Sequence, residues 1–366
     1  MSIYWNKLIN SIEPYVAGEQ PKEGQRIIKL NTNENPYPPS PKCKEALIDL
    51  DISKLRLYPN TDSTVVCEAV ASVDNVSPEN VFVGNGSDEV LALCWQTFFE
   101  KDMNTDKAVL IPSISYSFYP VYADFYSIRA EKIPLKDDLT IDPEDYCGKP
   151  NCGISIANPN APTSIAMSLD DIRKILDANK ESVVLIDEAY AAFAEGYTSA
   201  ATLINEYKNL IVVRTLSKSY GLAGLRLGYA IGDKELIEGL KRARDSFNSY
   251  PADYIAQTLA AAALRDRENF KKNRDALIAT RNRVTKELRS MGFDLPDSSS
   301  NFVFARPPMP LTAETLYKNL KAKGILVRYF NKPLINDRLR ISIGTDEEMD
   351  EFLKAVREEI SNGKNS

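Results

Sequence analysis

Short apolar segments alternate with helical patterns between about residues 55 and 250. Continuous apolar runs of this kind, separated by helices, predict a mostly parallel sheet that is buried on both faces. Ligands of such sheets bind beyond the carboxyl ends of the strands, so this edge is where we expect a site. The strand candidates are Val81–Val83, Ala108–Pro112, Gly153–Ala157, Val183–Ile186, Leu210–Thr215 and Tyr229–Ile231.

The pattern changes after residue 252. Two long helices and a mixture of shorter elements predict a smaller α+β domain at residues 253–366, after a large domain at 43–252. Residues 1–42 are rich in Pro and Asn near their end, which predicts an extended arm. The C-terminal elements are helices at Asp253–Leu264, Arg267–Met291, Ala313–Lys323 and Glu347–Ile360, and strands at Phe302–Ala305, Leu326–Arg328 and Leu339–Ser342.

Composition narrows the classes of function. The net charge of −6 argues against a nucleic-acid binder, which normally needs a basic face. No apolar run reaches the roughly 18 residues of a membrane span, and Met1–Tyr15 lacks the apolar core of a signal peptide. We therefore expect a cytoplasmic protein that binds neither membrane nor nucleic acid.

The chain contains no histidine and five cysteines, none of them in a C-x-x-C pair. These counts exclude a Ser-His-Asp triad, a Cys-His pair and imidazole metal ligands, and they argue against a thiolate zinc site or a disulfide framework. We expect no metal. Proton transfer must then use Lys, Tyr, Asp, Glu, Cys or a cofactor.

The most specific local motif is T-L-S-K-S-Y-G-L-A-G-L-R, Thr215–Arg226, which follows an apolar strand. The hydroxyls of Thr215 and Ser217 can donate to phosphate oxygens, and the guanidinium of Arg226 can form bidentate, charged hydrogen bonds with the same phosphate. Lys218 then remains free to form a Schiff base. A strand-to-helix loop with a solvated lysine is the alternative that the motif alone leaves open.

Two further motifs lie at predicted strand ends. In V-V-L-I-D-E-A-Y, Asp187 ends a buried strand, where it is either a helix N-cap or a carboxylate that keeps the pyridine nitrogen of pyridoxal phosphate (PLP) protonated. Tyr190, three residues on, can bond the phenolic oxygen of that ring. Gly84–Glu89, G-N-G-S-D-E, lets backbone approach a ligand at a helix N-terminus, although it matches neither common nucleotide-loop pattern.

Together these motifs, in this order, resemble the fold-type I PLP enzymes. Further matches run along nearly the whole chain, and the set is most similar to the histidinol-phosphate aminotransferase family. This resemblance implies an α/β large domain with a mostly parallel seven-stranded sheet, PLP as cofactor, and a 2-oxo acid as amino acceptor. The additional matching segments are Glu13–Tyr15, Leu30–Tyr37, Tyr58–Asn60, Pro112–Tyr119, Asn158–Thr163, Ser300–Val303, Gly324–Arg328 and Leu339–Thr345.

The resemblance also implies roles for single residues. Lys218 would hold PLP and move the proton at the substrate Cα, Asp187 would pair with the ring nitrogen, and Tyr190 would bond the ring oxygen. Tyr116 would stack on the ring. The cofactor phosphate would be held by backbone N–H groups of Ser87 and Asp88 together with Thr215, Ser217 and Arg226.

Other matched positions belong to the substrate and to a second subunit. Arg340 matches the arginine that receives the amino acid carboxylate, and Arg328, Tyr15 and Asn35 match positions on the substrate side. Tyr58 matches the tyrosine that reaches the cofactor phosphate of the neighbouring subunit, which implies a homodimer with shared active sites. A turn aromatic is the structural alternative for Tyr58, as a solvated strand arginine is for Arg328.

The chain departs from the family at one motif. The family commonly reads N-P-N-N-P-T-G, with an Asn that bonds the ring oxygen, whereas this chain has Ala161 and Ser164 in place of that Asn and the Gly. Either Asn160 takes over the role or Tyr190 serves the ring oxygen alone.

Three functions compete as explanations of this pattern. The first is an aminotransferase, for histidinol phosphate in histidine biosynthesis or for an aromatic amino acid. The second is a threonine-phosphate decarboxylase on the same scaffold. The third, a PLP-binding regulator, needs a DNA-binding module for which the chain has no room before Leu30.

Overall fold

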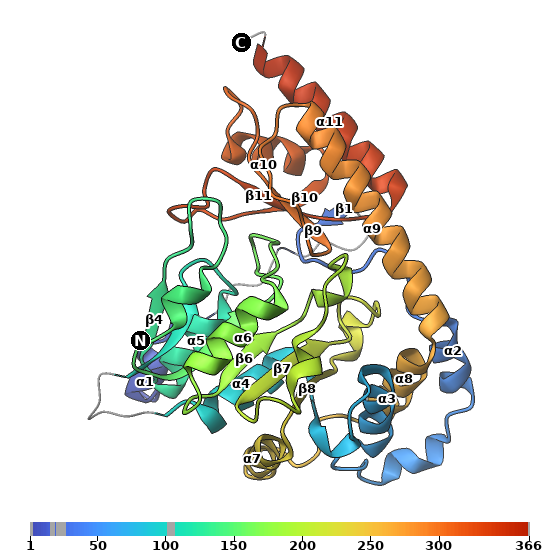
Figure 1. The fold of residues 1–366 in the computed structure, drawn as a ribbon. Helices are drawn as coiled ribbons and strands as arrows, with labels where there is room; N and C mark the ends of the chain where they lie inside the picture. The colour runs from blue at the N-terminus through green and yellow to red at the C-terminus, as the bar shows by residue number, and fades with distance from the viewer. Residues whose placement is uncertain (1–2, 15–18, 20–26, 101–106, 365–366) are drawn as a thin grey trace.

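The computed structural model describes residues 3–14, 19, 27–100 and 107–364. Its larger sheet has the strand order β2-β8-β7-β6-β5-β3-β4 (Figure 1). Strand β8 is antiparallel to both of its neighbours, and the other paired strands are parallel. The expected mostly parallel α/β sheet is therefore confirmed. The strands are β2 (Val81–Gly84), β3 (Ala108–Pro112), β4 (Ala130–Ile133), β5 (Asn151–Ala157), β6 (Val184–Asp187), β7 (Leu210–Thr215) and β8 (Gly228–Gly232).

Helices cover both faces of this sheet. Successive strand residues point to opposite faces, so Val184 and Ile186 pack in one core, whereas Leu185 packs in the other. The first face is covered by α3 (Thr64–Asp74), α6 (Leu169–Ala178) and α8 (Tyr254–Arg265). The second is covered by α4 (Gly86–Phe98), α5 (Phe118–Tyr126) and α7 (Lys234–Asp245). Burial on both faces explains the continuous apolar runs of the sequence.

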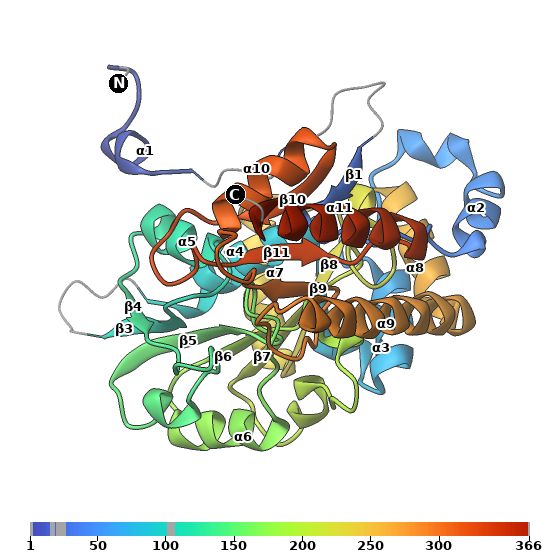
Figure 2. The same ribbon diagram turned by 90° about the horizontal axis from the view of Figure 1, so that it is seen from above.

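A second sheet of four strands has the order β1-β10-β11-β9 and a hydrophobic core of its own. Helices α9 and α11 run side by side along it (Figures 1 and 2). The domain boundaries expected from the sequence stay predictions. The elements are β1 (Ile28–Leu30), β9 (Phe302–Ala305), β10 (Ile325–Tyr329), β11 (Leu339–Ser342), α9 (Arg267–Ser290), α10 (Ala313–Ala322) and α11 (Asp346–Lys364).

The structure adds elements that the sequence pattern did not predict. The expected extended arm contains helix α1 (Lys7–Ser11) and strand β1, which pairs in parallel with β10. Helix α2 (Pro41–Ile48) begins at a proline, which is favoured at the first helical position. The unpredicted edge strand β4 carries exposed Glu131 and Lys132, so it lacks an apolar run. Short 3₁₀ helices lie at Ile52–Arg56, Pro78–Asn80, Pro143–Tyr146, Ala191–Phe193, Ala200–Leu203 and Ala223–Leu225.

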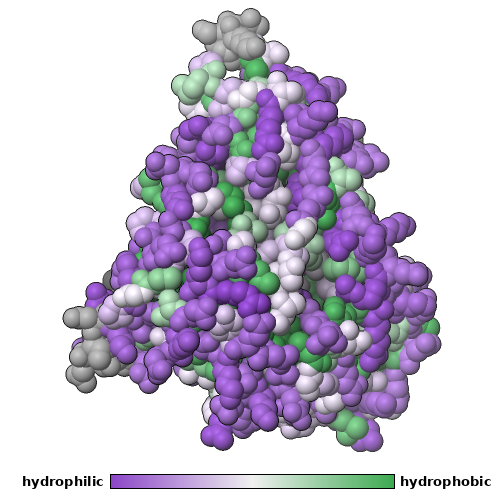
Figure 3. Space-filling view, in the orientation of Figure 1, coloured by the Kyte–Doolittle hydropathy of each residue, from purple (hydrophilic) through white to green (hydrophobic). Residues whose placement is uncertain are grey.

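Hydrophilic residues dominate the face of the molecule shown in Figure 3, and hydrophobic residues appear there in small groups. Among the helices of the described residues, none combines the length and the apolar content that a membrane crossing needs.

Candidate active site

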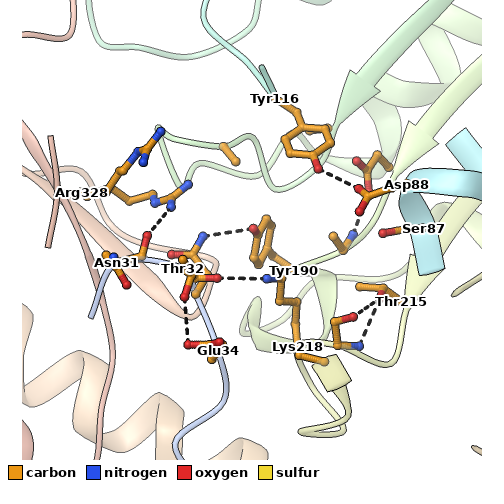
Figure 4. Close-up of a pocket in the computed structure, with 18 of the residues that line it drawn as sticks. Asn31, Thr32, Glu34, Ser87, Asp88, Tyr116, Tyr190, Thr215, Lys218 and Arg328 are labelled. Carbon is orange, nitrogen blue, oxygen red and sulfur yellow. Dashed lines mark hydrogen bonds between the residues drawn. The ribbon is translucent and has the colours of Figure 1, made fainter. Parts of the chain in front are cut away.

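A cavity of about 210 Å³ lies where the carboxyl ends of β5, β6 and β7 meet the N-terminus of α4 and the strands β10 and β11 (Figure 4). This is the sheet edge at which the sequence predicts a ligand. Most of its lining is polar. The lining residues are Asn31, Thr32, Asn33, Glu34, Ser87, Asp88, Tyr116, Ala157, Ala161, Asp187, Ala189, Tyr190, Thr215, Ser217, Lys218, Ala223, Arg226, Arg328 and Arg340.

Asp187 ends strand β6, and the register places it between Ala157 and Val213 of the neighbouring strands. Its carboxylate accepts hydrogen bonds from the backbone N–H of Ala189 (3.1 Å) and the hydroxyl of Tyr119 (3.2 Å). Burial raises the pKa of Asp187 to about 7, although those two bonds oppose the shift. Within the described part of the chain, no cation pairs with this carboxylate, so it can receive a protonated nitrogen of a ligand.

Lys218 follows a turn that its neighbours fix. Thr215 Oγ1 accepts from the backbone N–H of Ser217 (3.1 Å) and donates to that residue's hydroxyl (2.9 Å). The Nζ of Lys218 donates to the carbonyl of Thr32 (3.2 Å) and lies 5.9 Å from the ring centre of Tyr190. An amine therefore enters the cavity beside two hydroxyls, as the motif predicted.

The first turn of α4 forms the opposite wall. Its N–H groups have no acceptor within the helix, so they can donate to an anion. Gly86 has a φ of 82°. A Cβ on it would lie 2.7 Å from a guanidinium nitrogen of Arg226. Arg226 also contacts Asp88 (3.3 Å), whose other oxygen accepts from the hydroxyl of Tyr116 (2.8 Å). Burial and then Asp88 raise the pKa of Tyr116 well above its ordinary value, so this phenol stays protonated.

These groups fit PLP. Helix N–H groups, two hydroxyls and a guanidinium suit a phosphate, and the buried carboxylate of Asp187 suits a pyridinium. The aromatic ring of Tyr116 lines the same cavity, and Lys218 supplies the amine (Figure 4). These donors meet within one cavity, although they come from separate stretches of the chain.

Two arginines line the cavity from the smaller sheet. Arg328 on β10 and Arg340 on β11 are directly opposite each other in the antiparallel register. Directly opposite residues of an antiparallel pair lie on the same face of the sheet, so both guanidinium groups can contact one anion in the cavity. Arg340 also donates to the carbonyl of Asn31 (2.9 Å).

A second cavity, of about 500 Å³, opens beside the first and shares Tyr116, Ala161, Arg328 and Arg340 with it. Glu13 and Pro14 also line it. Tyr15, which the sequence predicts on the substrate side, lies outside the described residues.

Three predicted residues do not line the main cavity. Asn35 donates to the backbone carbonyl of Lys218 (2.9 Å), so it holds the lysine turn from behind. The amide of Asn160 donates to the carbonyl of Ile114 and to the Thr163 hydroxyl, while its oxygen accepts from Ser115. Tyr58 is 81% exposed and stacks on Tyr250 with ring centres 4.5 Å apart. In a single chain Tyr58 therefore reaches no part of the cavity.

The substituted motif has distinct local consequences. Ala161 lines the cavity where the family has its Asn, and both N–H donors of the Asn160 side chain are already used, by Ile114 and Thr163. Ser164 has a φ of 67°, which explains why the family uses glycine there, and its hydroxyl is buried with no hydrogen-bond partner among the described residues.

Several cavity residues were not singled out from the sequence. The run Asn31–Glu34 lies in the matching segment Leu30–Tyr37, from which only Asn35 was chosen, and it lines the cavity and contacts Arg340, Lys218 and Tyr190. A polar run directly after the apolar strand β1 is the pattern that could have identified it. Tyr119, which bonds Asp187, lies in the aromatic segment already noted, although only Tyr116 was chosen from that segment.

Known proteins share this architecture. The model of the aminotransferase class I and II family matches residues 25–356. A histidinol-phosphate aminotransferase of Clostridium acetobutylicum is 49% identical over 361 residues, which cover 99% of this chain and all of that protein. One of Chromohalobacter salexigens is 48% identical, covering 97% of this chain and 99% of that protein.

A solved structure shows the same fold. The crystal structure of histidinol-phosphate aminotransferase from Sinorhizobium meliloti, in complex with pyridoxal 5'-phosphate, superposes with a TM-score of 0.85 at 22% identity, covering 99% of each chain. The fold, the cavity and the similarity over nearly the whole sequence agree. The chain therefore belongs to the aminotransferase class I and II family and is a PLP-dependent aminotransferase.

Proposed function

We propose that this enzyme transfers the amino group of histidinol phosphate to 2-oxoglutarate, in histidine biosynthesis. The observation that carries the proposal is the pair Arg328 and Arg340, opposite each other at the cavity. One substrate of this reaction carries a phosphate ester and the other a carboxylate, and paired guanidinium groups suit both anions. The printed names of the relatives, at 48–49% identity, point in the same direction.

Bound PLP supplies an electron sink for the negative charge at the substrate Cα. Lys218 holds the cofactor and then moves the proton at Cα through its Nζ, which gives a chain without histidine its acid–base group. Asp187 keeps the ring nitrogen protonated, and Tyr190 donates to the ring oxygen. Tyr116 covers one face of the ring.

The phosphate of the cofactor is held at the N-terminus of α4. Backbone N–H groups there donate to it, and hydroxyls and a guanidinium complete the cup. The residues that we assign to this cup are Ser87, Asp88, Thr215, Ser217 and Arg226.

Arg340 receives the carboxylate of glutamate, and Arg328 holds the phosphate of histidinol phosphate with Tyr15. Asn160 and Asn35 act indirectly, since Asn160 supports the segment of Ala161 and Asn35 holds the backbone of Lys218. The experiment is a panel of amino donors with 2-oxoglutarate, including histidinol phosphate, phenylalanine and tyrosine. Turnover of histidinol phosphate with glutamate formation is expected.

Variants of the two arginines make this experiment sharper. Arg328→Ala should raise the KM for histidinol phosphate much more than that for glutamate, whereas Arg340→Ala should impair both half-reactions. If the wild type ignores histidinol phosphate and converts phenylalanine, the substrate assignment is wrong. Release of carbon dioxide without a keto acid would instead indicate a decarboxylase.

The assignment of Lys218 has its own test. Borohydride reduction of the yellow protein should fix the cofactor to the peptide that contains Lys218. Labelling of another lysine would refute the assignment, whatever the substrate is.

We also propose a homodimer with shared active sites, in which Tyr58 reaches the partner's cofactor phosphate. The sequence segments next to Tyr58 and to its stacking partner Tyr250 carry exposed large hydrophobic residues, which supports an interface there. Mixed Tyr58→Ala and Lys218→Ala subunits should regain part of the activity, and a fully active monomer by light scattering would exclude the dimer. The exposed residues are Leu47, Ile48, Ile52, Leu55, Leu57, Phe247 and Tyr250.

A cytoplasmic location is part of the same proposal. The five cysteines, Cys43, Cys67, Cys94, Cys147 and Cys152, are all unpaired, which suits a reducing compartment. Fractionation of cells, followed by detection of the enzyme in the cytosolic fraction, tests it.

A further inference from the structure

The phenolic oxygen of Tyr190 has a buried hydrogen-bond partner outside the motifs of the large sheet. The side-chain amide of Asn33 donates to it over 3.0 Å (Figure 4). Asn33 is 1% exposed and belongs to the segment between β1 and α2, so the contact spans 157 positions of the chain. The bond therefore exists only because the N-terminal segment crosses the cavity.

Three other hydrogen bonds fix Asn33. Its backbone N–H donates to the hydroxyl of Ser342 (2.8 Å), and that hydroxyl donates back to the side-chain oxygen of Asn33 (2.9 Å). Its carbonyl accepts from Asn301 (2.9 Å). Since the amide oxygen is held by Ser342, the amide nitrogen is the atom that faces Tyr190. The structure thus presents a donor, and not an acceptor, to the phenol.

This donor limits the acceptors to which the Tyr190 hydroxyl can donate its own hydrogen bond. A tyrosine hydroxyl has one hydrogen to donate and accepts at its oxygen. Because Asn33 donates to the oxygen of this hydroxyl, the O–H of Tyr190 remains available to donate to another acceptor in the cavity. The side chain of Ala161 has no donor for the ring oxygen, and both N–H donors of the Asn160 side chain are used by Ile114 and Thr163.

We propose that Asn33 is a positioning residue that holds the Tyr190 hydroxyl as the donor to the ring oxygen of bound PLP. The inference rests on the role proposed for Tyr190. It gives this chain, which lacks the family's Asn at position 161, a second way to secure that one bond.

The test compares two variants of Asn33 that preserve its backbone. The φ of Asn33 is 55°, a conformation that Gly and Asp tolerate better than Ala. Asn33→Gly deletes the donor. Asn33→Asp keeps the shape but presents an acceptor, which would draw the Tyr190 proton away from the cofactor.

The measurement is the pH midpoint of the absorbance change of bound PLP. A hydrogen bond to the ring oxygen stabilises the deprotonated form of the chromophore, so its loss moves the midpoint to higher pH. A bond to a charged group corresponds to about one to two pH units. We expect a rise of roughly one unit in Asn33→Asp and a smaller rise in Asn33→Gly.

The matched control is the same pair of changes in a Tyr190→Phe background. There Asn33→Gly should leave the midpoint where Tyr190→Phe alone has set it, because the proposed effect acts through the phenol, whereas Asn33→Asp can still shift it through the added negative charge. A further shift by Asn33→Gly in that background would show that Asn33 acts through Ser342 and Asn301 instead, and would overturn the proposal.

An unchanged midpoint in both Asn33 variants, with PLP still fixed to Lys218 by borohydride, would also overturn it. Failure of the proposed function looks different, because the wild type would then not convert histidinol phosphate, whereas the midpoint of its bound PLP would still respond to the Asn33 changes. Ser342→Ala provides a second measurement if Asn33→Gly does not fold, since it frees the Asn33 amide and should move the midpoint in the same direction.

Discussion

Asp187 and Glu188 are neighbours in the sequence, and both are buried, but they lie on opposite faces of the large sheet. Asp187 accepts two hydrogen bonds and has no cationic partner among the described residues. Glu188 is paired with Arg214 (2.9 Å) and also accepts from Tyr197 (2.8 Å), Ser199 (2.7 Å) and the N–H of Ala200 (2.7 Å).

The comparison separates two uses of a buried carboxylate. A charge that is paired and hydrogen bonded holds segments together, here β6, β7 and the loop after β6. A charge with few partners is unfavourable in the protein alone and becomes favourable when a ligand supplies a cation. Sequence pattern does not distinguish the two residues, whereas their partners do.

The largest effect expected is on stability, at Glu188. Glu188→Ala leaves Arg214 with Asp74 as its remaining carboxylate and should lower the free energy of unfolding by roughly 3 to 5 kcal/mol. Asp187→Asn, measured by urea unfolding without cofactor, should cost nothing or stabilise. Equal losses in the two variants would break the comparison.

Turnover should depend strongly on Asp187, whose replacement by Asn is expected to cost no stability. Asp187→Ala and Asp187→Asn lose the charged bond to the cofactor, which contributes about 1.5 to 3 kcal/mol, or about one to two decades in rate. The matched control is Tyr119→Phe, which removes one bond to Asp187 but keeps the carboxylate and should retain most of the activity. Near-normal turnover in Asp187→Ala would mean that the residue is only a cap.

The pH dependence of stability gives an effect that is spread over several pH units, about 1.4 kcal/mol for each. Burial raises the pKa of Asp187 in the folded protein to about 7, above the ordinary 3.8, so the folded protein binds this proton more tightly than the unfolded chain does. Without PLP, the wild type should therefore lose stability relative to Asp187→Asn as pH rises from about 4 to 7, by roughly 1.4 kcal/mol per unit. Parallel urea profiles of the two proteins would contradict this.

The smallest effect concerns the loop after β5, which contacts both the Glu188 side of the sheet and the cavity. Asn158 in this loop accepts from the N–H of Met167 and donates to Tyr197, on the Glu188 side, whereas Ala161 lines the cavity. Ser164→Gly removes a left-handed non-glycine residue and a buried, unpartnered hydroxyl. It should stabilise the protein by about 1 kcal/mol, seen as a higher Tm, while Ser168→Gly, which removes the α6 N-cap, should destabilise it.

Much of the large sheet could be predicted because its strands are short and buried on both faces. Strands such as Ala108–Pro112 and Leu210–Thr215 were bounded as observed. Strand β1 was missed because Ile28–Leu30 is short and becomes a strand only by pairing with β10. The edge strand β4 was missed because exposed charged residues interrupt its apolar pattern.

The sequence by itself determined the fold class and the cofactor-side candidates, because Asp187, Lys218 and their neighbours follow buried strands whose carboxyl ends must meet at one sheet edge. Only the tertiary structure decided that Asn33 bonds Tyr190, that Arg328 lies opposite Arg340, and that Asn160 supports a loop instead of lining the cavity. Those contacts join segments far apart in the chain. Local patterns carry no information about them, since they depend on how the smaller sheet and the N-terminal segment pack across the larger one.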